Sequence, residues 1–117
     1  MIMKKKVLLV NFKEKAGWTE KDILNENRKY NATAIRDIEK AKQALDADKF
    51  YYVVFFLSYS GDPGFINYVA ERHQETKLIV TATSTAFDKY GGLTAGLNGR
   101  KLEFPYEIKE LFEALKN

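Results

Sequence analysis

The chain has 117 residues, 45% hydrophobic and 30% charged, which predicts one globular domain over residues 1–117 and excludes a disordered chain. Nineteen basic and 16 acidic residues give a net charge of +3, intermixed except at Lys4-Lys5-Lys6, too weak a basic signal to predict a nucleic-acid partner. No cysteine is present, which excludes disulfides, thiolate metal sites and a cysteine nucleophile. The apolar part of residues 1–12 is too short for a signal sequence or a membrane span, so we expect a cytoplasmic protein without a membrane partner.

Five segments predict β-strands, and four of them are mainly apolar. The central one, Tyr51–Leu57, has no charged residue, which is typical of a strand covered on both faces in a parallel sheet. Ala32–Ile35 is short and rich in small residues, which favours an edge position. The complete set of expected strands is Lys6–Asn11, Ala32–Ile35, Tyr51–Leu57, Leu78–Ala82 and Lys101–Phe104.

Helical patterns alternate with these strands. Thr19 predicts the N-cap of a first helix that runs to about residue 28, and Asp37 caps a second helix. Asp62-Pro63 predicts the start of a third helix, which ends near His73. Residues 83–98 are ambiguous because a helical stripe of Phe87, Tyr90 and Leu93 is interrupted by two glycines. The last helix is well defined by the spacing of Ile108, Leu111, Phe112 and Leu115 on one face.

This alternation predicts an α/β fold with an open, five-stranded, doubly wound parallel sheet and right-handed crossovers. Ligands of such sheets bind beyond the carboxyl ends of the strands. The residues expected there, around Phe56 and Leu57, are apolar.

The order of elements and several local motifs resemble the receiver domain of two-component response regulators over nearly the whole chain. Val7–Val10 looks like the first strand of that family, Asp62-Pro63-Gly64 resembles the loop before its third helix, and Ile79–Ala82 is similar to its fourth strand. Ala95–Gly99 followed by Phe104-Pro105 resembles its glycine-bearing turn and the end of its fifth strand. The resemblance implies the flavodoxin-like (βα)5 arrangement with strand order 2-1-3-4-5.

The resemblance also implies where phosphoryl chemistry would occur. The acidic pair that holds Mg²⁺ in the family falls on Asn11 and Phe12, and the phosphoacceptor aspartate falls on Phe56, or on Leu57 or Ser58 if the register shifts. The lysine of the family falls on Phe104. Only a hydroxyl remains, at Thr81, where a purely structural role is equally consistent with the sequence.

This pattern identifies a degenerate receiver, or pseudo-receiver, without the phosphoacceptor aspartate, without a cofactor and without enzyme activity. We expect Phe12, Phe56 and Phe104 to meet at the carboxyl end of the sheet and to fill the pocket with buried rings. The aromatic switch position of the family falls on Lys101, or on Arg100 by an alternative count, where a long cation extends to solvent.

Other site chemistries are weaker. His73, the single histidine, suits the end of a helix better than catalysis. The carboxylates of Glu14, Asp62, Asp88 and Glu103 define a displaced metal site as an alternative, since they are expected near one edge of the sheet. No phosphate-binding loop of the flavodoxin, Walker or dinucleotide type is present.

The expected function is therefore that of a protein-interaction or regulatory module in signal transduction. The resemblance implies a partner surface, which a homodimer can also use, on the fourth helix, fifth strand and fifth helix. Its candidate residues are Phe87, Tyr90, Arg100, Lys101, Glu103 and Tyr106. The alternative is a switch that binds a small molecule or a metal ion through the displaced carboxylates.

Overall fold

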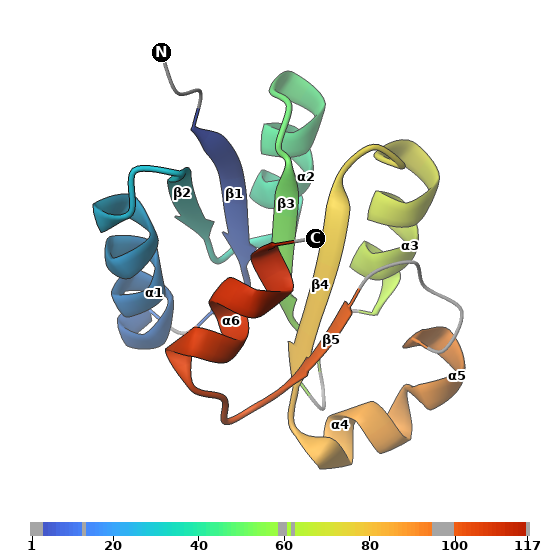
Figure 1. Ribbon diagram of the computed structural model, residues 1–117. Coiled ribbons are helices and arrows are strands. Elements are labelled where there is room, and N and C mark those ends of the chain that lie inside the picture. Colours follow the sequence, from blue (N-terminus) through green and yellow to red (C-terminus); the bar gives the residue numbers. More distant parts are fainter. Residues whose placement is uncertain (1–3, 13, 59–60, 62, 95–99, 117) are drawn as a thin grey trace.

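The order of strands and helices follows the predicted alternation in a computed structural model, which describes residues 4–12, 14–58, 61, 63–94 and 100–116. Figure 1 shows a central sheet with helices on both faces. The elements are β1 (Lys5–Val10), α1 (Glu14–Glu26), β2 (Tyr30–Ile35), α2 (Ile38–Ala47), β3 (Tyr52–Phe56), α3 (Gly64–Arg72), β4 (Lys77–Ala82), α4 (Ser84–Lys89), α5 (Gly91–Thr94), β5 (Arg100–Glu103) and α6 (Ile108–Leu115).

The five strands form one parallel sheet in the order β2-β1-β3-β4-β5, which confirms the predicted fold class. β2 lies at an edge, as its small residues predicted. β3 lies at the centre, and its residues 52–55 are buried, because neighbouring strands flank it and helices cover both of its faces.

Two apolar cores lie on the two faces of the sheet. One face packs on α2, α3 and α4 through residues such as Leu45, Phe65 and Ala86. The opposite face packs on α1 and α6 through Leu24 and Leu111. Alternate residues of each strand enter opposite cores, which explains why the central strands are apolar without interruption.

The first helix begins earlier than predicted. The structure starts α1 at Glu14, so residues 14–18 form its first turns and Thr19 lies inside the helix. Gly17 lies in these turns, but one glycine costs a helix only about 1 kcal/mol and does not prevent it. The second helix follows the prediction, because the Asp37 side chain accepts hydrogen bonds from the backbone N–H groups of Glu39 and Lys40.

Smaller differences lie at other helices. Pro63 is the N-cap of α3 and not its first helical residue, while Asp62 lies outside the described residues. The ambiguous segment after β4 forms two short helices, α4 and α5, divided at Tyr90. Ile108 is 37% exposed, because it lies in the first turn of α6, beyond the edge of the core that the rest of its stripe covers.

Among the residues that the structure describes, the helices are all too short or too polar to cross a membrane.

Candidate functional site

The carboxyl ends of β3, β4 and β5 lie level with one another. Phe56 pairs in register with Thr81, and Thr81 pairs with Leu102. Beyond the strands, the Leu57 amide donates to the Thr81 carbonyl at 2.8 Å and the Phe104 amide donates to the Ala82 carbonyl at 2.7 Å. This register brings Phe56, Thr81 and Phe104 to the same edge, where the resemblance placed the family's acceptor, hydroxyl and lysine.

Asn11 joins the end of β1 to both neighbouring strands. Its backbone adopts the left-handed conformation (φ 65°), which asparagine tolerates better than most residues. Its amide N–H donates to the Ile35 carbonyl at 3.1 Å, and its Nδ2 donates to the Phe56 carbonyl at 2.9 Å. The side chain therefore connects β1 to β3, at a position where the family carries a carboxylate.

The phenylalanines form a continuous chain of ring contacts with Phe56 in the middle. The ring centroids of Phe12 and Phe56 are 5.8 Å apart, and those of Phe56 and Phe104 are 5.3 Å apart with an interplanar angle of 82°. Tyr106 extends the chain, since its ring lies 5.9 Å from that of Phe104. Both Phe104 contacts have the edge-to-face geometry that aromatic pairs prefer. We call Phe12, Phe56, Phe104 and Tyr106 the aromatic chain.

Burial falls steadily along these rings. Phe12 is 5% exposed, Phe56 is half-buried, and Phe104 is 36% exposed. The expectation that all three rings become core is therefore right for Phe12 and wrong for Phe104. Phe104 follows β5, the edge strand, so it has neighbouring strands on one side only.

The Thr81 hydroxyl is enclosed without a partner. Thr81 is fully buried, and its Oγ1 forms no hydrogen bond within the described part of the chain. A buried hydroxyl without a partner costs about 1–3 kcal/mol, so this oxygen does not stabilise the fold through a hydrogen bond. It lies at the position where the resemblance placed the family's hydroxyl, and the aromatic chain does not satisfy it.

A buried carboxylate ends the aromatic chain, and the sequence did not predict it. Glu20 of α1 is 9% exposed, and the Tyr106 hydroxyl donates a short hydrogen bond to it. Burial raises the pKa of Glu20, and the hydrogen bond from Tyr106 acts in the opposite direction. Burial and the carboxylate also raise the pKa of Tyr106. The available signal was the spacing of Glu20 and the buried Leu24, which places both on one helical face.

The residues assigned to a partner surface divide into two groups. Lys101 and Glu103 of β5 are exposed, whereas Phe87 and Tyr90 are half-buried and pack against the core below α4. Tyr106 does not join them, because its ring packs on Phe104 and its hydroxyl faces α1. The Arg100 side chain lies outside the described part of the structure.

A shallow hollow of about 360 Å³ lies between β5 and α6. Its lining includes Lys101, Leu102 and Lys109, together with Glu110, Glu113 and Ala114. The exposed part of the predicted partner surface is therefore continuous with a groove that carries both charges.

The displaced metal site receives no support from the described residues, which contain no group of three or more histidine, aspartate or glutamate side chains suited to a metal ion. Asp62 and the side chain of Glu14 lie outside the described part. His73 ends α3, as predicted, and its Nε2 lies 3.1 Å from Asp46 Oδ1.

Comparison with known proteins identifies the fold. No protein-family model and no curated protein matches the chain. Solved structures do match over nearly its full length. A signal receiver domain of an HD domain-containing protein from Pseudomonas fluorescens has a TM-score of 0.80 at 20% identity, covering 97% of this chain and 93% of that one. A CheY-like response regulator receiver domain from Methylobacillus flagellatus has a TM-score of 0.80 at 17% identity, covering 97% and 98%.

A structure described as adenylate cyclase from Rhodopirellula baltica is also similar, with a TM-score of 0.83 at 14% identity, covering 97% of this chain and 85% of that one. The chain thus has the receiver fold. At these identities the likeness extends to the arrangement of strands and helices.

Proposed function

We propose that this chain is a receiver-like domain of signal transduction that acts without phosphorylation, as a regulatory module that binds a protein partner. The observation that carries the proposal is the position of Phe56. It occupies the end of β3 beside Thr81, and its ring lies between those of Phe12 and Phe104.

Phosphoryl transfer to a receiver needs an oxygen nucleophile and oxygen ligands for Mg²⁺. A phenyl ring supplies neither, and Asn11 uses its Nδ2 to hold the Phe56 carbonyl. Lys101 is exposed at the position that the resemblance assigns to the family's switch aromatic, and this supports the same proposal. Turning its charged side chain into the core would remove the ammonium group from water, which costs free energy, so an inward switch is disfavoured. The proposal therefore includes no cofactor and no catalysis.

The proposed partner surface is the exposed side of β5 with α4 and α6. Lys101, Glu103 and the groove beside α6 provide charged groups of both signs, which favours a protein surface with complementary charges over a nucleic acid. Since no phosphorylation changes this surface, its binding is expected to be constitutive and to be regulated by the amount of partner.

The first test is an amide NMR titration with Mg²⁺ and then with Mg²⁺ plus beryllofluoride, which stands in for an aspartyl phosphate. A receiver that retains its acidic pair and acceptor aspartate serves as the positive control. We expect no saturable shifts at Asn11, Phe56, Thr81 and Phe104. Saturable shifts clustered at these four residues would contradict the proposal and favour a switch that binds a ligand.

The interaction role has a separate test. Sedimentation of the chain over a range of concentrations detects a homodimer, and Lys101→Glu is expected to weaken it. Lys40→Glu on α2 is the matched control, since it reverses one exposed lysine far from β5. An equal effect of both variants would exclude the β5 surface as the dimer contact.

A further inference from the structure

A second feature lies at the opposite end of the sheet, where the strands begin. Lys5 opens β1, Tyr51 immediately precedes β3, and Lys77 opens β4. Because β3 lies between β1 and β4, the register sets these residues side by side. The Tyr51 amide donates to the Lys6 carbonyl at 2.9 Å, and the Lys77 amide donates to the Tyr51 carbonyl at 2.9 Å.

Two ammonium groups converge on the Tyr51 ring. Lys5 Nζ lies 4.4 Å from its centroid and Lys77 Nζ lies 5.1 Å from it, while the side of the ring open to water leaves Tyr51 41% exposed. Neither ammonium forms an ion pair with a carboxylate of the described residues, in contrast to Lys6, which pairs with Asp48. Two like charges at one ring repel each other, and a bound anion relieves that repulsion.

The two lysines change the acidity of the Tyr51 hydroxyl. A hydrogen bond from Lys77, together with the positive charges of Lys5 and Lys77, lowers the pKa of Tyr51 below its ordinary value. The environment of the phenol oxygen therefore favours a negative charge, and the three side chains supply two ammonium groups and one hydroxyl as hydrogen-bond donors.

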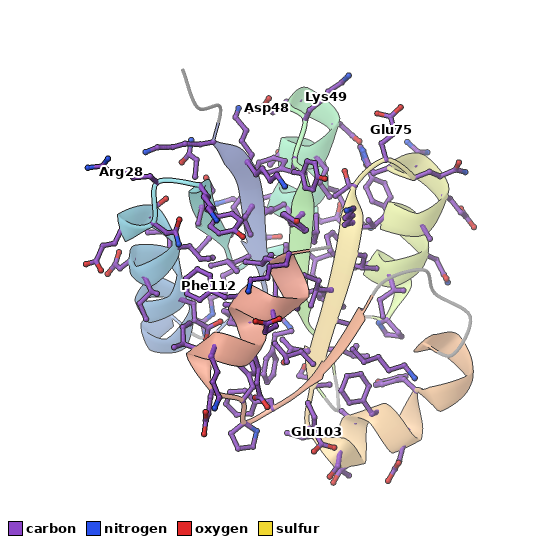
Figure 2. All side chains as sticks on the ribbon, in the orientation of Figure 1. Arg28, Asp48, Lys49, Glu75, Glu103 and Phe112 are labelled. Carbon is purple, nitrogen blue, oxygen red and sulfur yellow. The ribbon has the colours of Figure 1, made fainter. Side chains whose placement is uncertain are left out.

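A hollow of about 940 Å³ opens beside Tyr51. Its lining includes Lys4 and Lys5 at the start of β1, together with Glu71 in the last turn of α3 and Glu75 in the segment that follows it. Figure 2 shows Asp48, Lys49 and Glu75 around this end of the sheet, opposite Glu103. The volume lies within the range of small-molecule sites. Lys5 and Tyr51 belong to its lining, and Lys77 reaches it only through its contact with the Tyr51 ring.

We propose that Lys5, Tyr51 and Lys77 form an anion subsite for the phosphate group of a small phosphorylated molecule that occupies this hollow. The phosphate oxygens accept hydrogen bonds from the two ammonium groups and from the Tyr51 hydroxyl. Free polyphosphate and a nucleotide share this chemistry, and the test separates them.

The experiment is an amide NMR titration of the full chain at low ionic strength with inorganic phosphate, tripolyphosphate, ATP and a short single-stranded RNA. We expect saturable shifts at the Tyr51 and Lys77 amides with tripolyphosphate and ATP, weakened by added salt. Additional shifts in the lining of the hollow with ATP alone would identify a nucleotide as the source. Tighter binding of the RNA than of tripolyphosphate at equal phosphate concentration would overturn the small-molecule proposal.

Two variants distinguish the subsite from general charge. Lys5→Gln/Lys77→Gln is expected to weaken tripolyphosphate binding by about tenfold or more, because each lysine supplies a charge-assisted hydrogen bond. Arg36→Gln/Lys40→Gln removes the same charge elsewhere, from two exposed side chains, and is expected to leave the affinity within about twofold, since those charges are screened at that distance. Equal weakening in both double variants, or no saturable shift with any of the probes, would overturn the proposal.

Tyr51→Phe provides the finer measurement. It retains the ring and both cation–π contacts and removes only the phenol oxygen, so affinity should fall by a smaller factor than in the lysine variant. Unchanged affinity would remove Tyr51 from the subsite.

Discussion

The carboxyl ends of β1, β3 and β5 lead into phenylalanines that contact one another, whereas the amino ends of β1 and β4 carry lysines around an exposed tyrosine. At the first end, apolar rings occupy the positions to which the resemblance assigned the charged groups of receivers. At the second end, two cations remain without carboxylate partners among the described residues. The comparison teaches that one sheet can carry an apolar cluster of rings at one end and a concentration of positive charge at the other.

Phe56→Asp introduces charge at the apolar end of the sheet, and we expect it to have the largest effect on stability. It places a carboxylate at the position that the resemblance assigns to the family's acceptor, between the two apolar rings of Phe12 and Phe104. We expect a loss of about 4–5 kcal/mol in the free energy of unfolding, measured by urea denaturation at neutral pH. Phe56→Leu, which keeps an apolar side chain, should cost less than about 1.5 kcal/mol. A Phe56→Asp variant as stable as the wild type would show that packing of the Phe56 ring does not stabilise the fold.

Truncation at the two ends of the phenylalanine series tests the gradient in burial. Phe12→Ala should lower the free energy of unfolding by about 3–4 kcal/mol, as expected for a buried phenylalanine. Phe104→Ala should cost roughly half as much, because its ring is already partly in water. Equal losses in denaturant unfolding would mean that Phe104 is covered in solution, for example by a second molecule.

The Glu20–Tyr106 contact gives a pH-dependent effect of intermediate size. Tyr106→Phe removes the donor from a buried carboxylate and should cost about 1–3 kcal/mol at neutral pH. Because burial raises the pKa of Glu20, its contribution to stability is fully present below the ordinary glutamate pKa and is lost as pH rises through the folded-state pKa.

Glu20→Gln should therefore gain stability relative to the wild type as the pH rises from about 4 to 7, in urea unfolding at several pH values. Glu75→Gln, on an exposed glutamate, is the control and should follow the wild-type profile. A Glu20→Gln profile parallel to that of the wild type would contradict the burial of this carboxylate.

The smallest effect concerns the lysine end. Lys5→Gln/Lys77→Gln should raise the pKa of Tyr51 towards its ordinary value, because it removes the hydrogen bond and the charges that lower that pKa. Ultraviolet titration of this variant, with Tyr51→Phe as the reference for the other tyrosines, measures the change. An unchanged Tyr51 titration would place the ammonium groups away from the ring in solution.

The fold was predictable because uninterrupted apolar strands and helical stripes encode it directly. The burial of residues 52–55 and the Asp37 cap are local consequences of residue type and spacing. The meeting of Phe12, Phe56 and Phe104 was also predictable, since parallel strands bring their carboxyl ends to one edge. The resemblance to receivers indicated which of these positions correspond to charged residues in that family.

What the sequence did not predict depends on contacts between distant elements. The sequence places Glu20 in the first turn of a helix capped at Thr19. In the structure α1 begins at Glu14, so Glu20 lies inside the helix, where its carboxylate contacts the Tyr106 hydroxyl. The lysines around Tyr51 come from separate strands, and only the strand order brings them together. Exposure of Phe104 follows from its place beyond an edge strand, which residue type does not encode.

The rings of the aromatic chain come from the beginning, the middle and the end of the sequence, and this affects the order of folding. Contacts between segments so far apart form only after long loops have closed, so they contribute little before β5 joins β4. Substitutions such as Phe104→Ala are therefore expected to accelerate unfolding more than they slow folding, in stopped-flow measurements of both rates. The aromatic chain would then lengthen the lifetime of the native state, a kinetic property that equilibrium stability does not report.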